Sequence, residues 1–276
     1  MSGAGHFADR LAAAVERKGA PLCIGIDPDP ALMPVGLGVA EFCRGIVDAV
    51  ADVAVAVKPQ AAFFEAQGAM GWAELADVCR YARRAGLLVI ADAKRGDVPS
   101  TARAYAAAFA PLADAVTVNP YLGRDSLEPF FVHEGLGVLA LVKTSNPGSA
   151  DVQDLLLEDG RPLWQHVAGL VDRWGADHIG EGGLSSVGAV VGATHPEVLE
   201  TVRSLMPRAV LLLPGVGAQG GRLEELAAAF AGGPASALPS ASRSVLYADG
   251  GAGWQEAAAA EAARLADELR AVAVPG

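Results

Sequence analysis

The chain has 276 residues, of which 52% are hydrophobic and 19% are charged, and this composition excludes a disordered chain. Its formal net charge of −11, without any run of Lys and Arg, argues against a nucleic-acid-binding surface. No apolar stretch approaches the length of about eighteen residues that a membrane span needs, and the amphipathic residues 1–19 do not resemble a secretory signal.

The cysteines and histidines predict neither disulfides nor a metal site. Cys23, Cys43 and Cys79 are odd in number, widely spaced and placed in or beside apolar runs, so we expect reduced packing residues in a cytosolic (cytoplasmic) protein. The five histidines are scattered, and the pairing of His178 with Glu181 lacks further ligands at metal-site spacing.

Apolar periodicity and glycine or proline punctuation predict an alternation of helices and strands. Helices are expected at residues 7–18, 40–52, 72–85, 99–109, 126–134, 161–174, 196–205, 222–230 and 254–272. Strands are expected at residues 22–26, 53–57, 87–94, 115–118, 138–142, 188–192, 210–213 and 237–242, of which 188–192 and 237–242 carry the weakest pattern. The segment 149–160 is long and polar for a loop of this kind and is a candidate lid.

Eight strand–helix units with polar residues at the strand ends predict a TIM (β/α)8 barrel. Length alone would also allow two domains, but a single barrel of roughly 250 residues fits equally well, and the alternation of elements decides for it. We therefore expect one barrel domain over residues 1–276, with a short N-terminal helix at about 6–18.

The third strand ends in an unusual set of charges. Its apolar run from Leu87 leads into Asp92, Lys94 and, beyond the strand, Asp97. Side chains alternate along a strand, so Asp92 and Lys94 are expected to point to the same side. Buried charges are destabilising unless they are paired, so this set at a strand's carboxyl end, where α/β folds bind ligands, indicates a functional site.

Polar residues also follow the other predicted strands, and in a barrel the carboxyl ends of all strands meet at one mouth. Besides Asp92 and Lys94, these candidates are Asp27, Lys58, Asn119, Ser145, the glycine-rich turn after Leu213, and Arg243. Any one of them could be an ordinary polar strand end, but charges on successive strand ends favour a common site.

The turn at 215–220 matches the dinucleotide-binding pattern G-x-G-x-x-G. That fingerprint belongs in a first βα turn with an acid about twenty residues on, and no acid occurs between Glu225 and Asp249. A plain glycine turn is one alternative. We favour a phosphate site at a helix N-terminus, made by backbone N–H groups and Gln219 with Arg243 arriving from the eighth strand.

Several sequence blocks together resemble one enzyme family. The residues Asp-Ala-Lys-Arg-Gly-Asp at 92–97, with Thr101 four positions on, look like the signature of orotidine 5′-phosphate decarboxylase. The other blocks agree in order: Gly-Ile-Asp-Pro at 25–28, Val-Lys-Pro-Gln at 57–60, Lys-Thr-Ser-Asn-Pro-Gly at 143–148, Pro-Gly-Val-Gly-Ala-Gln-Gly-Gly at 214–221 and Ser-Arg-Ser at 242–244. The likeness runs from about residue 6 to 250. The sequences of these blocks are similar to those of the longer bacterial branch of the family, often called type 2.

The resemblance implies conversion of orotidine 5′-monophosphate to uridine 5′-monophosphate and carbon dioxide, the last step of de novo pyrimidine synthesis. It implies no metal and no cofactor. It also implies a homodimer in which Asp97 and Thr101 reach into the neighbouring subunit's site.

The resemblance further implies roles for individual residues. Lys94 would stabilise the developing carbanion and donate the proton, Asp92 would face the substrate carboxylate, and Lys58 and Asp97 would keep Lys94 charged and oriented. The substrate-binding residues would be Asp27 and Thr101 at the ribose, Ser145 at the pyrimidine ring, and Pro214, Gly215, Gln219, Ser242 and Arg243 around the phosphate. Closure of the loop at 217–221 over the phosphate would use the free energy of phosphate binding to lower the activation barrier of the reaction.

Three other functions compete with this hypothesis. A related barrel enzyme acting on a sugar phosphate, such as a keto-gulonate phosphate decarboxylase or a hexulose phosphate synthase, would need magnesium. A non-catalytic nucleotide-binding module would use the phosphate turn and Arg243 but not Lys94. The hypothesis of an NAD-dependent oxidoreductase is weakened because no acidic residue follows the glycine-rich turn at the expected spacing.

Overall fold

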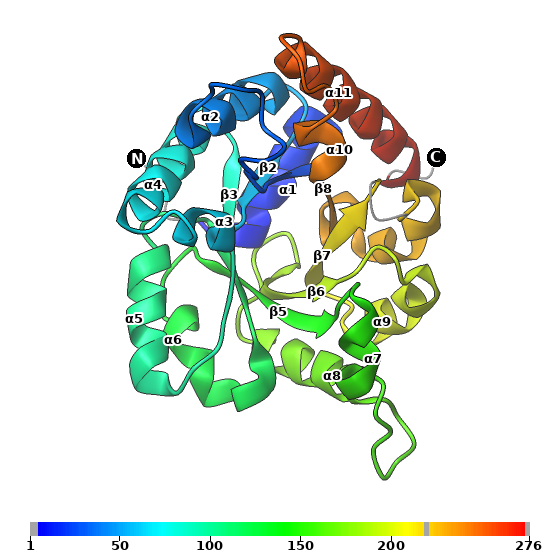
Figure 1. Cartoon of the computed structure of the whole chain (residues 1–276). Helices are drawn as coiled ribbons and strands as arrows, with labels where there is room; N and C mark the ends of the chain where they lie inside the picture. The colour runs from blue at the N-terminus through cyan, green and yellow to red at the C-terminus, as the bar shows by residue number, and fades with distance from the viewer. Residues whose placement is uncertain (1–4, 218–220, 274–276) are drawn as a thin grey trace.

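The chain forms a closed barrel of eight parallel strands in sequence order (Figure 1), seen in a computed structural model that describes residues 5–217 and 221–273. The strands are β1 (Cys23–Ile26), β2 (Ala56–Pro59), β3 (Leu88–Arg95), β4 (Ala115–Val118), β5 (Gly137–Lys143), β6 (Ser185–Val191), β7 (Ala209–Val216) and β8 (Ala237–Ala241). Cys23 of β1 pairs with Ser240 of β8 and closes the ring. The predicted TIM barrel is confirmed.

Helices surround the barrel (Figure 1). The α-helices are α1 (Phe7–Lys18), α2 (Val39–Val50), α3 (Ala61–Glu65), α4 (Ala69–Arg84), α5 (Pro99–Phe109), α6 (Glu128–Phe131), α7 (Ala150–Gln153), α8 (Leu163–Gly175), α9 (Leu199–Leu205), α10 (Arg243–Leu246) and α11 (Trp254–Ala273). The 3-10 helices are η1 (Pro120–Leu122), η2 (Arg124–Ser126), η3 (Pro147–Ser149), η4 (Pro196–Val198), η5 (Leu223–Gly232) and η6 (Pro234–Ser236). None of the helices in the described ranges is long and apolar enough to cross a membrane.

Alternation along the strands divides the core into two layers. In β3, Ile90 points into the barrel, whereas Val89 points outward and packs under the surrounding helices. Helix α1 adds Phe7 and Leu11 to the inner layer, and both side chains are fully buried. A Cβ at position 137 would lie 2.4 Å from the Phe7 ring, so a glycine is needed there for α1 to enter the barrel.

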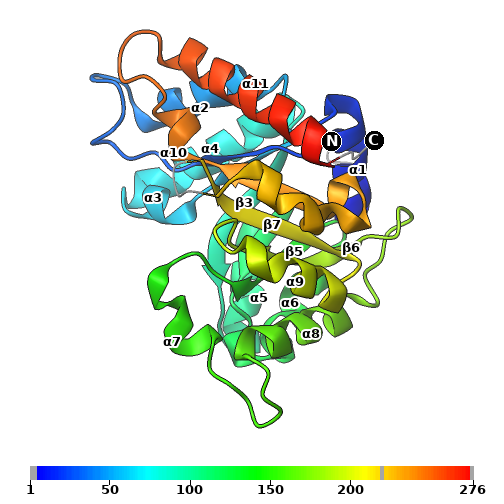
Figure 2. The same cartoon turned by 90° about the vertical axis from the view of Figure 1, so that its right-hand side faces the viewer.

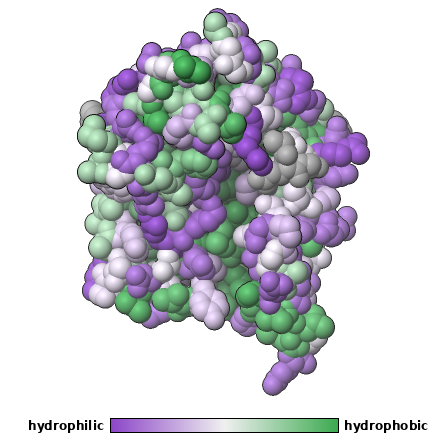
Figure 3. Space-filling view, in the orientation of Figure 1, coloured by the Kyte–Doolittle hydropathy of each residue, from purple (hydrophilic) through white to green (hydrophobic). Residues whose placement is uncertain are grey.

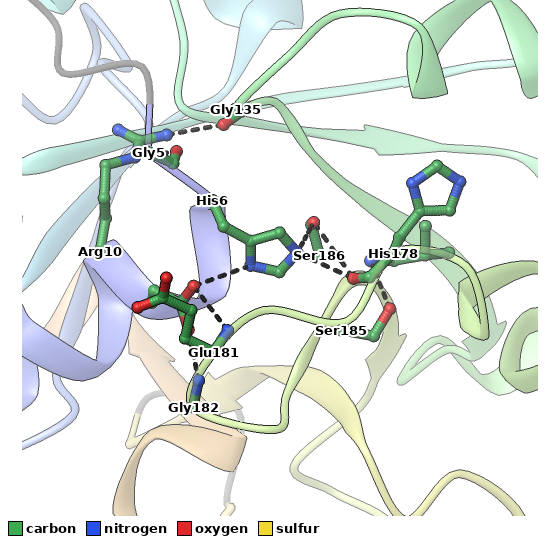
Figure 4. Close-up of polar contacts among 11 residues, drawn as sticks. Gly5, His6, Arg10, Gly135, His178, Glu181, Gly182, Ser185 and Ser186 are labelled. Carbon is green, nitrogen blue, oxygen red and sulfur yellow. Dashed lines mark hydrogen bonds and ion pairs between the residues drawn. The ribbon is translucent and has the colours of Figure 1, made fainter.

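Polar contacts fix α1 to the loop before β6 (Figure 4). The Asp9 carboxylate accepts hydrogen bonds from the backbone N–H groups of Glu181 and Gly182, at 3.0 and 2.8 Å. His6 Nε2 lies 2.8 Å from the carbonyl oxygen of His178. Figure 2 shows α1 at one end of the barrel and α3, α7 and α10 at the opposite end. Because α1 closes the end at which the strands begin, the carboxyl ends of the strands remain for a site.

The strand predicted at 53–57 was placed three residues too early. The N–H groups of Val53 and Ala54 bond to the carbonyl of Val50, at 3.1 and 2.9 Å, so these residues continue the end of α2. The apolar run therefore spans both the helix end and the start of β2, and hydrophobicity alone does not separate them.

Three predicted α-helices were wrong in type or extent, one of which, predicted at 196–205, begins as the 3-10 helix η4 and becomes α-helical only in α9. Of the helix predicted at 126–134 only α6 is α-helical, because His133 N–H bonds three residues back, to Phe130. The helix predicted at 222–230 is the 3-10 helix η5, in which Glu225 N–H bonds to the carbonyl of Arg222. The short helices α3, α7 and α10 were not predicted.

Candidate active site

A cavity of about 500 Å³ opens at the carboxyl ends of the strands. Most of the predicted site residues line it: Asp27, Lys58, Asp92, Lys94, Ser145, Pro214, Gly215, Ser242 and Arg243. Figure 3 shows a hollow near the middle of this face, with hydrophilic side chains on one wall and hydrophobic ones on the other. The apolar lining includes Leu141 of β5 and Val190 of β6.

The Asp92 carboxylate is the centre of the polar wall. Its Oδ2 accepts hydrogen bonds from Lys58 Nζ at 2.6 Å and from Gln60 Nε2 at 3.2 Å. Its Oδ1 accepts hydrogen bonds from Lys94 Nζ and, at 2.9 Å, from the hydroxyl of Thr117. Asp92 is only 4% exposed, so four donors, which lie in β2, directly after β2, in β3 and in β4, satisfy a carboxylate that water scarcely reaches.

The two buried partners stabilise each other's charge. Burial by itself would raise the pKa of Asp92, but the ammonium groups of Lys58 and Lys94 outweigh burial and hold that pKa well below its usual range. Burial by itself would lower the pKa of Lys58, but Asp92, followed by Asp27, raises it above its usual range. Asp92 is therefore ionised and Lys58 protonated at neutral pH.

Lys94 reaches the cavity through an irregular stretch of β3. Ile90 and Ala91 pair with β4 in regular register, but the next pairing joins Arg95 to Val118, so β3 bulges between them. At the bulge Lys94 has φ of +48°, the only positive φ of a non-glycine residue in the described ranges. Simple strand alternation predicted that Lys94 and Asp92 point to the same side, but neither their ion pair nor the bulge between them.

Asp27 directly follows β1, the strand that pairs with β2. Ser242 donates a hydrogen bond to its Oδ2, while its Oδ1 is buried and has no hydrogen-bond partner in the described part of the chain. The Tyr247 hydroxyl donates to the Asp27 carbonyl at 2.7 Å and accepts from the N–H of Asp29 at the same distance. A Cβ on Gly25 would lie 2.7 Å from Ser242 Oγ, so glycine permits this approach. Asp27 therefore lines the cavity with one carboxylate oxygen bound to Ser242 and the other without a partner among the described residues.

Arg243 supplies positive charge at the rim of the cavity, beside Pro214 and Gly215. Its guanidinium makes no ion pair with any described residue, unlike the buried Lys58. A guanidinium is suited to bidentate contact with a phosphate. The predicted phosphate ligand Gln219 lies outside the described residues, and the segment that follows it is η5 rather than an α-helix.

The loop after β5 forms another side of the cavity. Ser145 lines it, and a Cβ on Gly192 would lie 2.9 Å from the Ser145 Cβ, so glycine lets this loop pack against the end of β6. Helix α7 also lines the cavity and is tied to β5 by Asp154, whose carboxylate accepts two hydrogen bonds from Lys143 Nζ at 2.7 and 2.8 Å. The role of 149–160 as a lid stays a prediction.

Asp97 and Thr101 do not line the cavity of their own chain. Asp97 lies between β3 and α5, where its Oδ1 accepts a hydrogen bond from Val98 N–H at 2.7 Å. Thr101 lies in the first turn of α5 and is half-buried. The position of both residues away from this cavity is compatible with their predicted role in a neighbouring site.

Sequence reasoning missed two residues that contact Asp92. Gln60 belongs to the Lys-Pro-Gln block, so its place directly after β2 was available as a signal. Thr117 lies within an apolar strand and reads as an ordinary β-branched core residue, so nothing in the pattern marked it. In the described ranges, no three His, Cys, Asp or Glu side chains are grouped so that they could hold a metal ion.

Comparisons with known proteins agree on one family. Residues 20–260, which include all eight strands, match the family described as Orotidine 5′-phosphate decarboxylase / HUMPS family. The protein named Orotidine 5′-phosphate decarboxylase from Roseiflexus sp. (strain RS-1) is 49% identical over 274 residues, which cover 96% of this chain and 97% of that protein. The protein of the same name from Rhodopirellula baltica is 40% identical over 299 residues, covering 96% and 99%. The structure of Leishmania donovani OMP decarboxylase superimposes with a TM-score of 0.78 at 37% identity, covering 96% of this chain and 98% of that one.

Proposed function

The chain belongs to the orotidine 5′-phosphate decarboxylase family and converts orotidine 5′-monophosphate to uridine 5′-monophosphate and carbon dioxide, and we propose how its cavity performs that reaction. The observation that carries the proposal is the row Lys58, Asp92 and Lys94, in which one buried carboxylate holds two ammonium groups at the cavity wall.

Loss of carbon dioxide leaves an electron pair on a carbon of the pyrimidine ring, and this row supplies the charge that stabilises it. Lys94 is 41% exposed at its side chain and lines the cavity, so its ammonium group can stand beside the reacting carbon. It stabilises the negative charge as the bond to the carboxylate breaks, then donates its proton to that carbon. Water reprotonates the amine for the next turnover.

Asp92 and Lys58 keep Lys94 in place. Asp92 presents a fixed negative charge near the substrate carboxylate, and that repulsion disappears when carbon dioxide leaves. Because Lys58 is buried and paired with Asp92, it keeps that carboxylate ionised throughout the cycle. These groups are ordered before substrate arrives, so little reorganisation is needed during the reaction.

The remaining cavity residues bind the substrate. Asp27, which lines the cavity at the end of β1, accepts a hydrogen bond from a ribose hydroxyl, and Ser145 contacts the pyrimidine ring. Arg243 binds the phosphate, together with the backbone at Pro214 and Gly215 and with Gln219. The apolar wall at Leu141 and Val190 accommodates the departing carbon dioxide.

We propose that the active enzyme is a homodimer, in which Asp97 and Thr101 of each chain complete the site of its neighbour. The supporting observation is that Asp97 lies between β3 and α5 and Thr101 lies in the first turn of α5, yet neither lines the cavity of its own chain. Asp97 would then add a fourth charge, of alternating sign, on the far side of Lys94.

We also propose that the enzyme works in the cytoplasm and without a cofactor. The three cysteines are unpaired and buried, and burial raises the pKa of the Cys23 and Cys79 thiols to about 12, so they are packing residues rather than nucleophiles. A reducing compartment suits such thiols.

The test of the mechanism is the substitution Lys94→Ala. Formation of uridine 5′-monophosphate should become almost undetectable, whereas the far-ultraviolet circular dichroism spectrum and the affinity for uridine 5′-monophosphate should stay close to wild type. Substantial remaining kcat would contradict the role of Lys94 as proton donor. A different pair of results would favour the non-catalytic nucleotide-binding module: a wild type that does not convert orotidine 5′-monophosphate, and a Lys94→Ala variant that binds nucleotide as well as the wild type does.

A further inference from the structure

We propose that Thr117 is a positioning residue that holds Lys94 and Asp92 in their reactive arrangement through a single hydroxyl group. The inference rests on the proposed function of Lys94 and adds a residue to it. Thr117 lies in β4, the strand beside β3, and is 1% exposed. It does not line the cavity, so any effect on the reaction passes through the residues that it contacts.

The bulge in β3 creates the need for this hydroxyl. Between Ala91 and Arg95 the register of β3 on β4 shifts, and Thr117 lies between Val116 and Val118, which pair with β3 on either side of the shift. A bulged strand leaves backbone groups without their usual partners in the neighbouring strand. The N–H of Lys94 is one of these, and it donates to Thr117 Oγ1 at 3.0 Å.

The same hydroxyl also acts as a donor. Its O–H points to Asp92 Oδ1 at 2.9 Å, on the carboxylate oxygen that also binds Lys94 Nζ. The backbone of Lys94, the hydroxyl of Thr117, the carboxylate of Asp92 and the ammonium group of Lys94 therefore form a closed ring of hydrogen bonds. A hydroxyl is the simplest group that can accept from one neighbour and donate to the next in this way.

Lys94 depends on this ring because little else fixes it. Its backbone has φ of +48°, a region that costs a residue with a side chain roughly 1 kcal/mol or more and that persists only where the surroundings hold it. Its side chain is 41% exposed, so packing does not define the position of Nζ. The N–H bond to Thr117 and the ion pair to Asp92 therefore set the direction from which Nζ approaches the reacting carbon.

The substitution Thr117→Val tests the inference, because valine keeps the shape and removes the hydroxyl. We expect kcat for orotidine 5′-monophosphate to fall about tenfold or more, since the partly buried N–H of Lys94 and a buried carboxylate oxygen of Asp92 each lose a partner. KM and the affinity for uridine 5′-monophosphate should change less than about threefold, because Asp27 and Arg243 are untouched.

Three further variants separate positioning from folding. Thr117→Ser keeps the hydroxyl and should retain most of the wild-type kcat, whereas Thr117→Ala should lose as much as Thr117→Val. Thr201→Val makes the same chemical change on α9, outside the site, and should leave kcat unchanged. The Ser and Ala pair answers the question even if valine at position 117 perturbs the fold.

The outcomes are distinguishable. A Thr117→Val enzyme with wild-type kcat, or a Thr117→Ser enzyme as slow as Thr117→Ala, would overturn the positioning role. A loss of kcat matched by an equal loss of nucleotide affinity in both Val and Ala variants would show a merely structural residue. A wild type that does not decarboxylate orotidine 5′-monophosphate would instead overturn the function on which the inference rests.

Discussion

Lys58 Nζ lies 2.6 Å from Asp92 Oδ2, and each of the two side chains is only 6% exposed. The pair joins the ends of β2 and β3 at the cavity wall. A buried ion pair of this kind is weak evidence for stability by itself, since desolvation offsets much of the attraction. Because the pair lies at the cavity wall, we infer that it serves the proposed reaction, in which Asp92 holds a fixed negative charge beside Lys94.

Breaking the pair should destabilise the protein. In Asp92→Asn the Lys58 ammonium group stays buried but loses its counter-charge, so we expect the free energy of unfolding to fall by about 3 kcal/mol. Urea denaturation at neutral pH measures this. Asp267→Asn is the matched control, because that carboxylate is 72% exposed on α11 and should change the free energy of unfolding by less than about 1 kcal/mol. Equal effects of the two substitutions would mean that the Lys58–Asp92 pair is not desolvated in solution.

The same pair predicts a pH dependence of stability. The folded-state pKa of Asp92 is depressed, so its contribution is present above the unfolded pKa of about 4 and is lost as the pH falls below it. The folded-state pKa of Lys58 is raised, so its contribution is complete below an unfolded pKa of about 10.4 and is lost above it. Below neutral pH, the difference in unfolding free energy between wild type and Asp92→Asn should thus stay constant down to about pH 5 and shrink toward pH 3. A difference that stayed constant down to pH 3 would show that Asp92 is not held ionised by its neighbours.

Arg243 is the proposed ligand of the substrate phosphate. In Arg243→Ala we expect kcat/KM for orotidine 5′-monophosphate to fall between roughly tenfold and a hundredfold, the value of a charge-assisted hydrogen bond. The slow reaction of orotidine, which lacks the phosphate, should be the same in both enzymes. Arg264→Ala, on the outer helix α11, controls for loss of one positive charge. An unchanged kcat/KM would place the phosphate elsewhere.

The proposal that two subunits share each site can be tested by mixing two inactive variants. Lys94→Ala keeps a normal Asp97, and Asp97→Ala keeps a normal Lys94. If each site combines Lys94 of one chain with Asp97 of the other, random exchange of subunits restores about a quarter of wild-type activity, since half the dimers are hybrids with one intact site. Activity that stays at the level of the separate variants after proven subunit exchange would mean that both residues serve the same chain.

Much of the fold and the site could be predicted because the signals are local. Strands such as 115–118 are short apolar runs bounded by turns, and the structure has the same bounds for β4. The charged end of β3 stood out for the same reason, and the barrel brings it to Asp27, Lys58 and Arg243 from strands far apart in sequence.

What the sequence did not reveal depends on contacts between strands. The bulge at Lys94 arises where β3 and β4 lose register, and the role of Thr117 follows only from that bulge. In the sequence, Thr117 looks like an ordinary residue of an apolar core strand. Only the structure shows that its hydroxyl group bonds to Lys94 and Asp92. The late start of β2 was missed because the end of α2 is equally apolar, as at Val50 and Val53.

The most direct measurement is the ultraviolet absorbance of orotidine 5′-monophosphate incubated with the purified protein in excess chelator. We predict that the orotate band is lost and that one equivalent of uridine 5′-monophosphate accumulates, without any added metal. An unchanged band in chelator, with turnover of a sugar phosphate once magnesium is added, would contradict the account and assign this barrel to the magnesium-dependent reactions instead.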